Sequence, residues 1–182
     1  MTPSDTTFRY ARPLVALHWL MFALFIVVYA AMELRVLFDK GMPAREFFKS
    51  LHGMFGLCIL ALVFLRLLAK RWSHHPPPTD GPGIRLLLQR ASRIGHLILY
   101  LFMVIMPLMG WMMLSAAGKP IPFFGLALPA LIAPDAALAK QIKSVHTLVG
   151  NIGYGLIGLH VLAALFHQLV LKDHLMQRLR WR

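Results

Sequence analysis

Five histidines draw attention first because each lies among apolar residues in the 182-residue chain: His18, His52, His96, His146 and His160. An ionisable side chain inside a long apolar stretch is costly in lipid and is a candidate for a functional role. Neutral imidazole is also the most common metal ligand among side chains. These residues therefore predict metal ligation, with hydrogen bonding between helices as the simpler alternative.

The spacing from His146 to His160 is the most informative in the chain, at fourteen residues. At about 100° a residue this is about 1400°, which is about 40° short of four full helical turns. Both side chains therefore face the same way, with a difference in height of about 21 Å. Two haems stacked in one helical bundle need ligands on one helix face at such a separation, with partners from other helices at matching depth.

Composition predicts the elements that hold these histidines. Apolar residues make up 58% of the chain and charged residues 14%, whereas soluble domains have about 45–50% and about 25%. A membrane span needs about 20 apolar residues, and four stretches satisfy this, at about 13–37, 48–69, 94–114 and 144–171. We therefore predict an all-α fold in which residues 1–182 form one domain, a transmembrane four-helix bundle.

Basic residues indicate the orientation of this bundle. The two tails and the connection between the second and third spans hold eleven Lys and Arg residues, against seven on the other side. Because Lys and Arg are enriched in cytoplasmic segments, both termini are predicted to be cytoplasmic. The net charge of +12 has the same explanation, so no nucleic-acid partner is expected. Residues 118–135, with four prolines, are expected to form a loop over the far end of the bundle.

Depth then sorts the histidines into pairs. His52 matches His146 near the far face of the membrane, and His18 matches His160 near the cytoplasmic face. The pairs predict two haems, each ligated by two histidines, and full axial ligation suits electron transfer. Without a C-x-x-C-H motif the haems are expected to be of b type. His96 competes with His18 on depth; we assign it to packing or to support of a ligand, with ligation as the alternative.

Three further residues are assigned to the haems. Arg66 lies fourteen residues after His52, at the depth of His18 and His160, where a haem propionate would supply the anion that a buried arginine needs. The alternative is an arginine that extends to the headgroups. Gly56 and Gly153 follow His52 and His146 on their helices and would let a flat macrocycle approach the backbone. Close helix packing is the alternative for both glycines.

At these residues the chain resembles the bacterial cytochrome b561 family, and within it most resembles members that oxidise superoxide and reduce ubiquinone. The likeness covers nearly the whole chain. It rests on Leu17-His18-Trp19-Leu20, Ala31-Met32-Glu33-Leu34-Arg35, His52 with Gly56 and Arg66, Gly95-His96-Leu97, Lys143-Ser144-Val145-His146, Asn151-Ile152-Gly153-Tyr154, Ile157-Gly158-Leu159-His160, His167 and Lys172-Asp173.

The resemblance implies a multi-pass protein of the bacterial inner membrane. It also implies ligation of two haem b groups by His18, His52, His146 and His160, and a ubiquinone site at one haem. His167 follows His160 by seven residues, about 10 Å nearer the cytoplasm on the same face, and we assign it to ubiquinone. Where the family is expected to have a hydroxyl-bearing residue two positions before His18, this chain has Ala16, which removes one expected quinone contact.

The resemblance further implies an oxidoreductase that takes electrons from superoxide at the periplasmic haem and passes them to ubiquinone. Lys143 and Arg35 are the expected catalytic residues, since positive charge attracts the anion, and Lys49 and Lys140 are possible neighbours. Four acidic residues on the same side oppose this attraction: Glu33, Asp39, Glu46 and Asp135. The alternatives are an electron-relay subunit with a periplasmic redox partner protein and a bundle without a cofactor.

Overall fold

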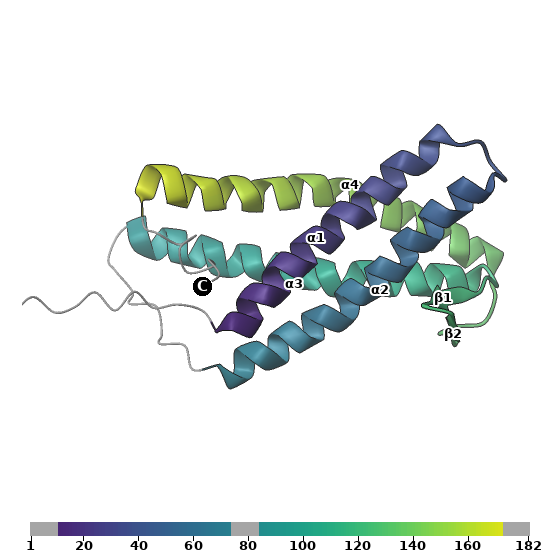
Figure 1. Cartoon of the computed structure of the whole chain (residues 1–182), viewed down its shortest axis with the longest axis horizontal. Coiled ribbons are helices and arrows are strands. Elements are labelled where there is room, and N and C mark those ends of the chain that lie inside the picture. The colour runs from purple at the N-terminus through teal and green to yellow at the C-terminus, as the bar shows by residue number, and fades with distance from the viewer. Residues whose placement is uncertain (1–10, 74–83, 173–182) are drawn as a thin grey trace, which may run out of the picture.

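The computed structural model describes residues 11–73 and 84–172, and it consists mainly of helices. Four long helices run along this part of the chain: α1 (Arg12–Leu34), α2 (Pro43–Trp72), α3 (Ile84–Ala116) and α4 (Ala136–Phe166) (Figure 1). Each is long and apolar enough to cross a membrane. The predicted all-α transmembrane four-helix bundle is therefore confirmed.

The helices extend beyond the predicted spans, most clearly at their starts. Helix α3 begins at Ile84 rather than near residue 94, and α4 at Ala136 rather than near residue 144. Basic residues such as Arg93 and Lys140 are unfavourable in hydrocarbon but are good helix formers, so the helix continues where the apolar stretch does not. The carboxylate of Asp135 fixes the start of α4 by accepting hydrogen bonds from the backbone N–H groups of Ala137 (2.9 Å) and Leu138 (3.0 Å).

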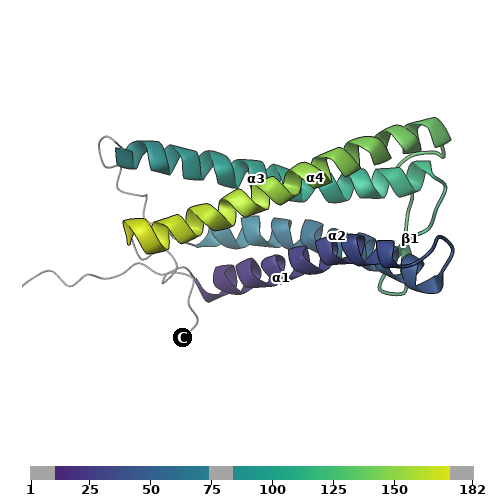
Figure 2. The same cartoon turned by 90° about the horizontal axis from the view of Figure 1, so that it is seen from above.

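The helices pack as two antiparallel pairs, α1 with α2 and α3 with α4, which meet through α2 and α3 (Figure 2). A small core lies between α1 and α2, formed by Met21, Val28, Ile59 and Val63. Residues of α3, among them Tyr100, pack against this core. Large apolar side chains such as Leu159 and Leu162 are exposed on the outside of the bundle, as expected for helices whose outer faces contact lipid.

A short hairpin, which the sequence did not predict, closes one end of the bundle. Strands β1 (Ile121–Phe123) and β2 (Leu126–Leu128) are antiparallel, with Ile121 opposite Leu128. The two turn residues, Phe124 and Gly125, both have positive φ, as the type I′ turn of a two-residue hairpin requires. We call this end of the molecule the hairpin end; it also holds the 3₁₀ turn η1 (Arg35–Leu37) that follows α1.

The expected position of this segment over the bundle end is confirmed by its contacts. The Phe124 N–H donates to the sulfur of Met54 at 3.4 Å, and the Phe124 ring packs edge-on against Phe55. Further along, the Trp111 indole N–H donates to the carbonyl of Pro129 at 2.9 Å. The segment is therefore attached to both α2 and α3.

Candidate functional site

Two imidazole rings face each other near the hairpin end. His52 lies on α2 and His146 on α4, each about 15 Å from the start of its helix. Their ring centroids are 6.1 Å apart and their planes cross at 79°. The fold thus brings together two residues that are separated by almost a hundred positions in the chain and that the sequence analysis paired.

The hydrogen bonds of these rings leave nitrogen atoms available. The Nδ1 atom of His52 lies 3.0 Å from the backbone carbonyl of Val28 on α1. Because a carbonyl can only accept, Nδ1 carries the proton and Nε2 keeps its lone pair. The Nδ1 atom of His146 is buried and makes no hydrogen bond of standard geometry to the described residues, but the ring interacts with the backbone of Met106 on α3. One ring is therefore oriented as metal-ligating histidines usually are, and the other lies against a backbone group of α3.

Three imidazoles gather near the opposite end of the bundle. His18 of α1, His160 of α4 and His96 of α3 are close enough to interact electrostatically with one another. The His96 and His160 rings are the closest, with centroids 5.5 Å apart and planes at 83°. The predicted pair of His18 and His160 thus shares its position with a third histidine.

His96 also has the local geometry of a ligand. Its Nδ1 atom lies 2.6 Å from the carbonyl of Ser92, one turn earlier in α3, so this nitrogen is the donor and Nε2 is free. In the sequence analysis His96 and His18 lay at similar depth, and His96 was assigned to packing or to support of a ligand. The Ser92 hydroxyl also lies 3.3 Å from this nitrogen, whereas the carbonyl is available from any residue one turn earlier, so little in the sequence indicated the oriented ring.

Arg66 reaches the same cluster from α2. It interacts electrostatically with His18 and His160, as its predicted depth required. Its guanidinium donates to the Leu14 carbonyl at 2.9 Å and to the Tyr100 hydroxyl at 3.3 Å. Both partners are neutral, so the charge of Arg66 remains available to an anion in the cluster.

Comparisons with known proteins bear on this arrangement of histidines. The family model for prokaryotic cytochrome b561 matches residues 9–180. The chain is 31% identical over 171 residues to cytochrome b561 homolog 1 of Escherichia coli (strain K12), covering 94% of this chain and 96% of that one. It is 32% identical over 174 residues to the probable superoxide oxidase CybB of Yersinia pestis, covering 94% and 95%. The chain belongs to the prokaryotic cytochrome b561 family.

Membership establishes the general character of this cytochrome b561 protein. Its family binds b-type haem and transfers electrons in membranes. With four membrane-spanning helices, the protein is a multi-pass component of the bacterial inner membrane. Family membership does not identify the residues of this chain that hold haem.

The His52–His146 pair fits a haem iron. Metal–imidazole bonds are about 2 Å long, so an iron between two ring nitrogens places the ring centroids about 6 Å apart, close to the 6.1 Å observed. Gly56 lies one turn from His52, and a Cβ atom built on it would meet no atom within 4 Å, as is also the case at Gly53, so the helix leaves room beside His52. Gly110 of α3, which the sequence analysis did not single out, lies against the His146 ring, where an added Cβ would be 3.5 Å from Cε1.

Gly153 has different surroundings. It is buried, and an added Cβ atom would collide with the Tyr29 hydroxyl and the Phe102 ring. The same Tyr29 hydroxyl donates a hydrogen bond to the Gly150 carbonyl at 3.0 Å. At this position the glycine allows side chains of α1 and α3 to approach α4. This matches close helix packing, which the sequence analysis gave as the alternative to contact with a haem.

We expect the Gly153→Ala substitution to lower the free energy of unfolding by about 1–3 kcal/mol, because the added methyl group overpacks the contact with Tyr29 and Phe102. Unfolding of the purified protein in detergent, followed by circular dichroism, measures this. The matched control is Gly155→Ala on the same helix, where an added Cβ meets nothing within 4 Å. Equal stability of the two variants would contradict the packing role of Gly153.

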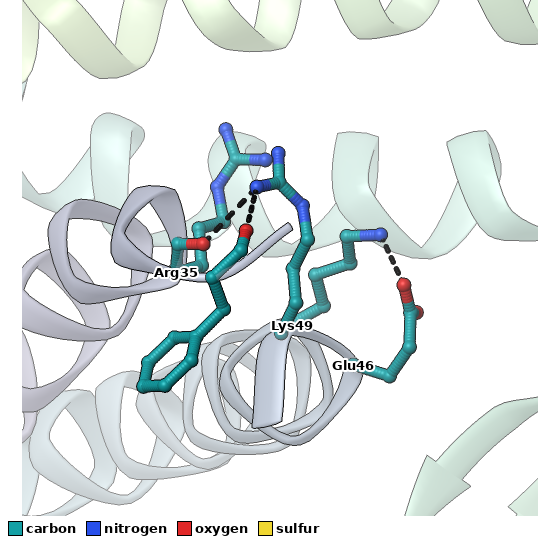
Figure 3. A network of polar contacts seen from close by, with 5 residues as sticks. Arg35, Glu46 and Lys49 are labelled. Carbon is teal, nitrogen blue, oxygen red and sulfur yellow. Dashed lines mark hydrogen bonds and ion pairs between the residues drawn. The ribbon is translucent and has the colours of Figure 1, made fainter. Parts of the chain in front are cut away.

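The remaining candidate residues lie at the two ends. At the hairpin end, Lys143 is exposed on α4, one turn before His146, and Arg35 of η1 is close enough to His52 to interact with it electrostatically. Lys49, a suggested neighbour, is paired instead with Glu46 at 2.5 Å (Figure 3). At the opposite end, His167 is half-buried and begins the π-helical turn η2 (His167–Leu171), and its ring packs against Phe166.

Proposed function

We propose that this cytochrome b561 protein binds two b-type haems, one between His52 and His146 and one between His18 and His160. The facing rings of His52 and His146, 6.1 Å apart, carry the proposal for the first. The cluster of His18, His160 and Arg66 supports the second, since Arg66 can pair with a propionate. Haem iron with two axial histidines exchanges single electrons without binding oxygen.

We further propose that the protein oxidises superoxide at the hairpin end and reduces ubiquinone at the opposite end. Each of two superoxide ions loses one electron and becomes dioxygen, and ubiquinone takes up the two electrons with two protons to become ubiquinol. Two observations support this reaction: a relative over almost the whole chain is named a probable superoxide oxidase, and Arg35 lies in electrostatic range of His52. The excess of basic residues on the other side supports a periplasmic hairpin end.

The residues of the chain have distinct parts in this proposal. Lys143 and Arg35 attract the superoxide anion to the hairpin end, where the local potential raises its concentration. His167 lies one π turn from the end of the described helix, where its imidazole can donate a hydrogen bond to a quinone carbonyl. Membrane lipid surrounds the outer faces of the helices and gives ubiquinone access to this end.

We expect Lys143→Glu to slow haem reduction by superoxide about tenfold at low salt, because reversal of the charge removes electrostatic steering. Stopped-flow absorption of the purified protein, mixed with superoxide and a water-soluble ubiquinone, measures the rate. The wild-type rate should fall as ionic strength rises, since the attraction is screened beyond about 8 Å at physiological salt.

A neutral chemical reductant is the control for this experiment, because it feels no steering and should reduce both proteins equally fast. A wild-type rate with superoxide that changes neither with salt nor with Lys143→Glu would argue against superoxide as donor. The protein would then be better described as a relay subunit that receives electrons from a partner protein docked at the hairpin end.

A further inference from the structure

Two arginines meet at the hairpin end, at the junction of α1 and α2. Arg35 begins η1, and Arg45 lies in the first turn of α2. One terminal nitrogen of Arg45 donates to the backbone carbonyls of Arg35 (3.2 Å) and Phe38 (2.6 Å). Figure 3 shows the Arg35 side chain extending to the same side as the guanidinium held by these two carbonyls. The position of Arg45 is thereby tied to the backbone of Arg35.

Neither guanidinium is fully satisfied. The Nε atoms of Arg35 and Arg45 are both buried and have no hydrogen-bond partner in the described residues. Arg35 makes no side-chain hydrogen bond to any residue in the described ranges. A buried donor without an acceptor is destabilising, and more so when it is charged. Two neighbouring cations with unsatisfied donors are therefore a favourable place for an anion.

The neighbouring acids do not supply that anion. Glu46 pairs with Lys49 at 2.5 Å, and Glu33 accepts a hydrogen bond from the Tyr154 hydroxyl at 2.5 Å. Within residues 11–73 and 84–172, neither Arg35 nor Arg45 forms a salt bridge. Glu46 is close enough to Arg45 to interact with it electrostatically but forms no salt bridge with it, so an anion bound directly by the two arginines would come from outside the described residues.

We propose that Arg35 and Arg45 form an anion site beside His52 that takes a group presenting two oxygens side by side, such as a carboxylate. The Nε atom and one terminal nitrogen of a guanidinium match two such oxygens in a bidentate hydrogen bond. The site deepens the proposed function, on which its location beside a haem rests. Its ligand has two possible sources, a propionate of the haem held by His52 and His146 or a free anion from solution.

The test uses the purified, haem-loaded protein and three variants. Arg35→Gln removes a guanidinium that makes no hydrogen bond to the described residues, so the fold loses no side-chain hydrogen bond. Arg45→Gln removes the second guanidinium together with its bonds to two carbonyls. Lys49→Gln is the matched control, because it removes a nearby positive charge that Glu46 already pairs. Circular dichroism confirms that each variant is helical.

Two measurements distinguish the sources: the rate of haem transfer to an apoprotein acceptor, and the binding of formate followed by calorimetry. If a haem propionate occupies the site, Arg35→Gln should speed the loss of one haem about tenfold or more, and the wild-type protein should not bind formate. If the site is free, the wild-type protein should bind formate, Arg35→Gln should abolish binding, and haem loss should be unchanged. Arg45→Gln should act like Arg35→Gln in either case.

The proposal is overturned if Arg35→Gln changes neither haem loss nor formate binding, or if Lys49→Gln has an equal effect. Neither measurement uses superoxide, so a failure of superoxide oxidation would not affect them. A failure of the proposed haem location would appear separately, as a His52→Ala variant with the full haem content.

Discussion

The His146→Ala variant should bind about one haem per chain where the parent protein binds about two. His146 and His52 are the histidines that face each other near the hairpin end, and their ring spacing of 6.1 Å suits an iron between them. Loss of either imidazole would leave one protein ligand at this proposed haem site, which would hold the haem too weakly to survive purification. The haem-to-protein ratio, measured as the pyridine haemochrome, gives the result directly.

His52→Ala is expected to remove the same haem, because both rings are proposed to hold one haem. In this variant the Val28 carbonyl also loses its imidazole partner, so a small loss of stability should accompany the loss of haem. The double variant should lose no more haem than either single one. If His146→Ala and His18→Ala were to remove the same haem, the proposed pairing across the bundle would be wrong.

The second large effect is expected at the cluster of three histidines. His18→Ala and His160→Ala should each remove the second haem and leave the first, whereas His96→Ala should retain both. The physical reason is depth: α1 and α4 bring His18 and His160 to one level, and Arg66 interacts with both. Absorption spectra and haem content of the three variants, prepared side by side, measure this.

His96 makes this experiment decisive. Its ring is 5.5 Å from that of His160, and its Nε2 atom is left free by the bond from Nδ1 to Ser92. A ratio near one haem per chain for His96→Ala, with a ratio near two for His18→Ala, would make His96 the ligand and His18 its neighbour. Loss of haem in all three variants would mean that the cluster acts as a unit.

The sequence alone determined the membrane fold and proposed which histidines pair. Four apolar stretches of membrane length are expected to be helical, because a helix pairs its own backbone N–H and C=O groups and lipid offers them no partner. The fourteen residues between His146 and His160 determined that both face one way, because helical phase is a local property of the backbone. His52 and His146 are far apart in the chain, but their predicted depths in the membrane match. Their rings are indeed close to each other in the structure.

The extent of the helices and the fold of the closing segment were less predictable. Hydropathy marks where lipid ends, but α3 and α4 continue past that point because charged residues can remain helical in water. The hairpin of residues 121–128 carries three-residue strands, too short for an alternating pattern to be recognised. Its position depends on contacts with Met54 and Phe55 of a different element.

The tertiary structure alone decided which side chains meet across helices. His96 lies beside His160, Tyr29 fills the space at Gly153, and Arg45 is tied to the backbone of Arg35. Each of these contacts depends on how two helices are rotated and how closely they approach. No local period in the sequence records those quantities, because they result from the packing of whole helix faces against one another.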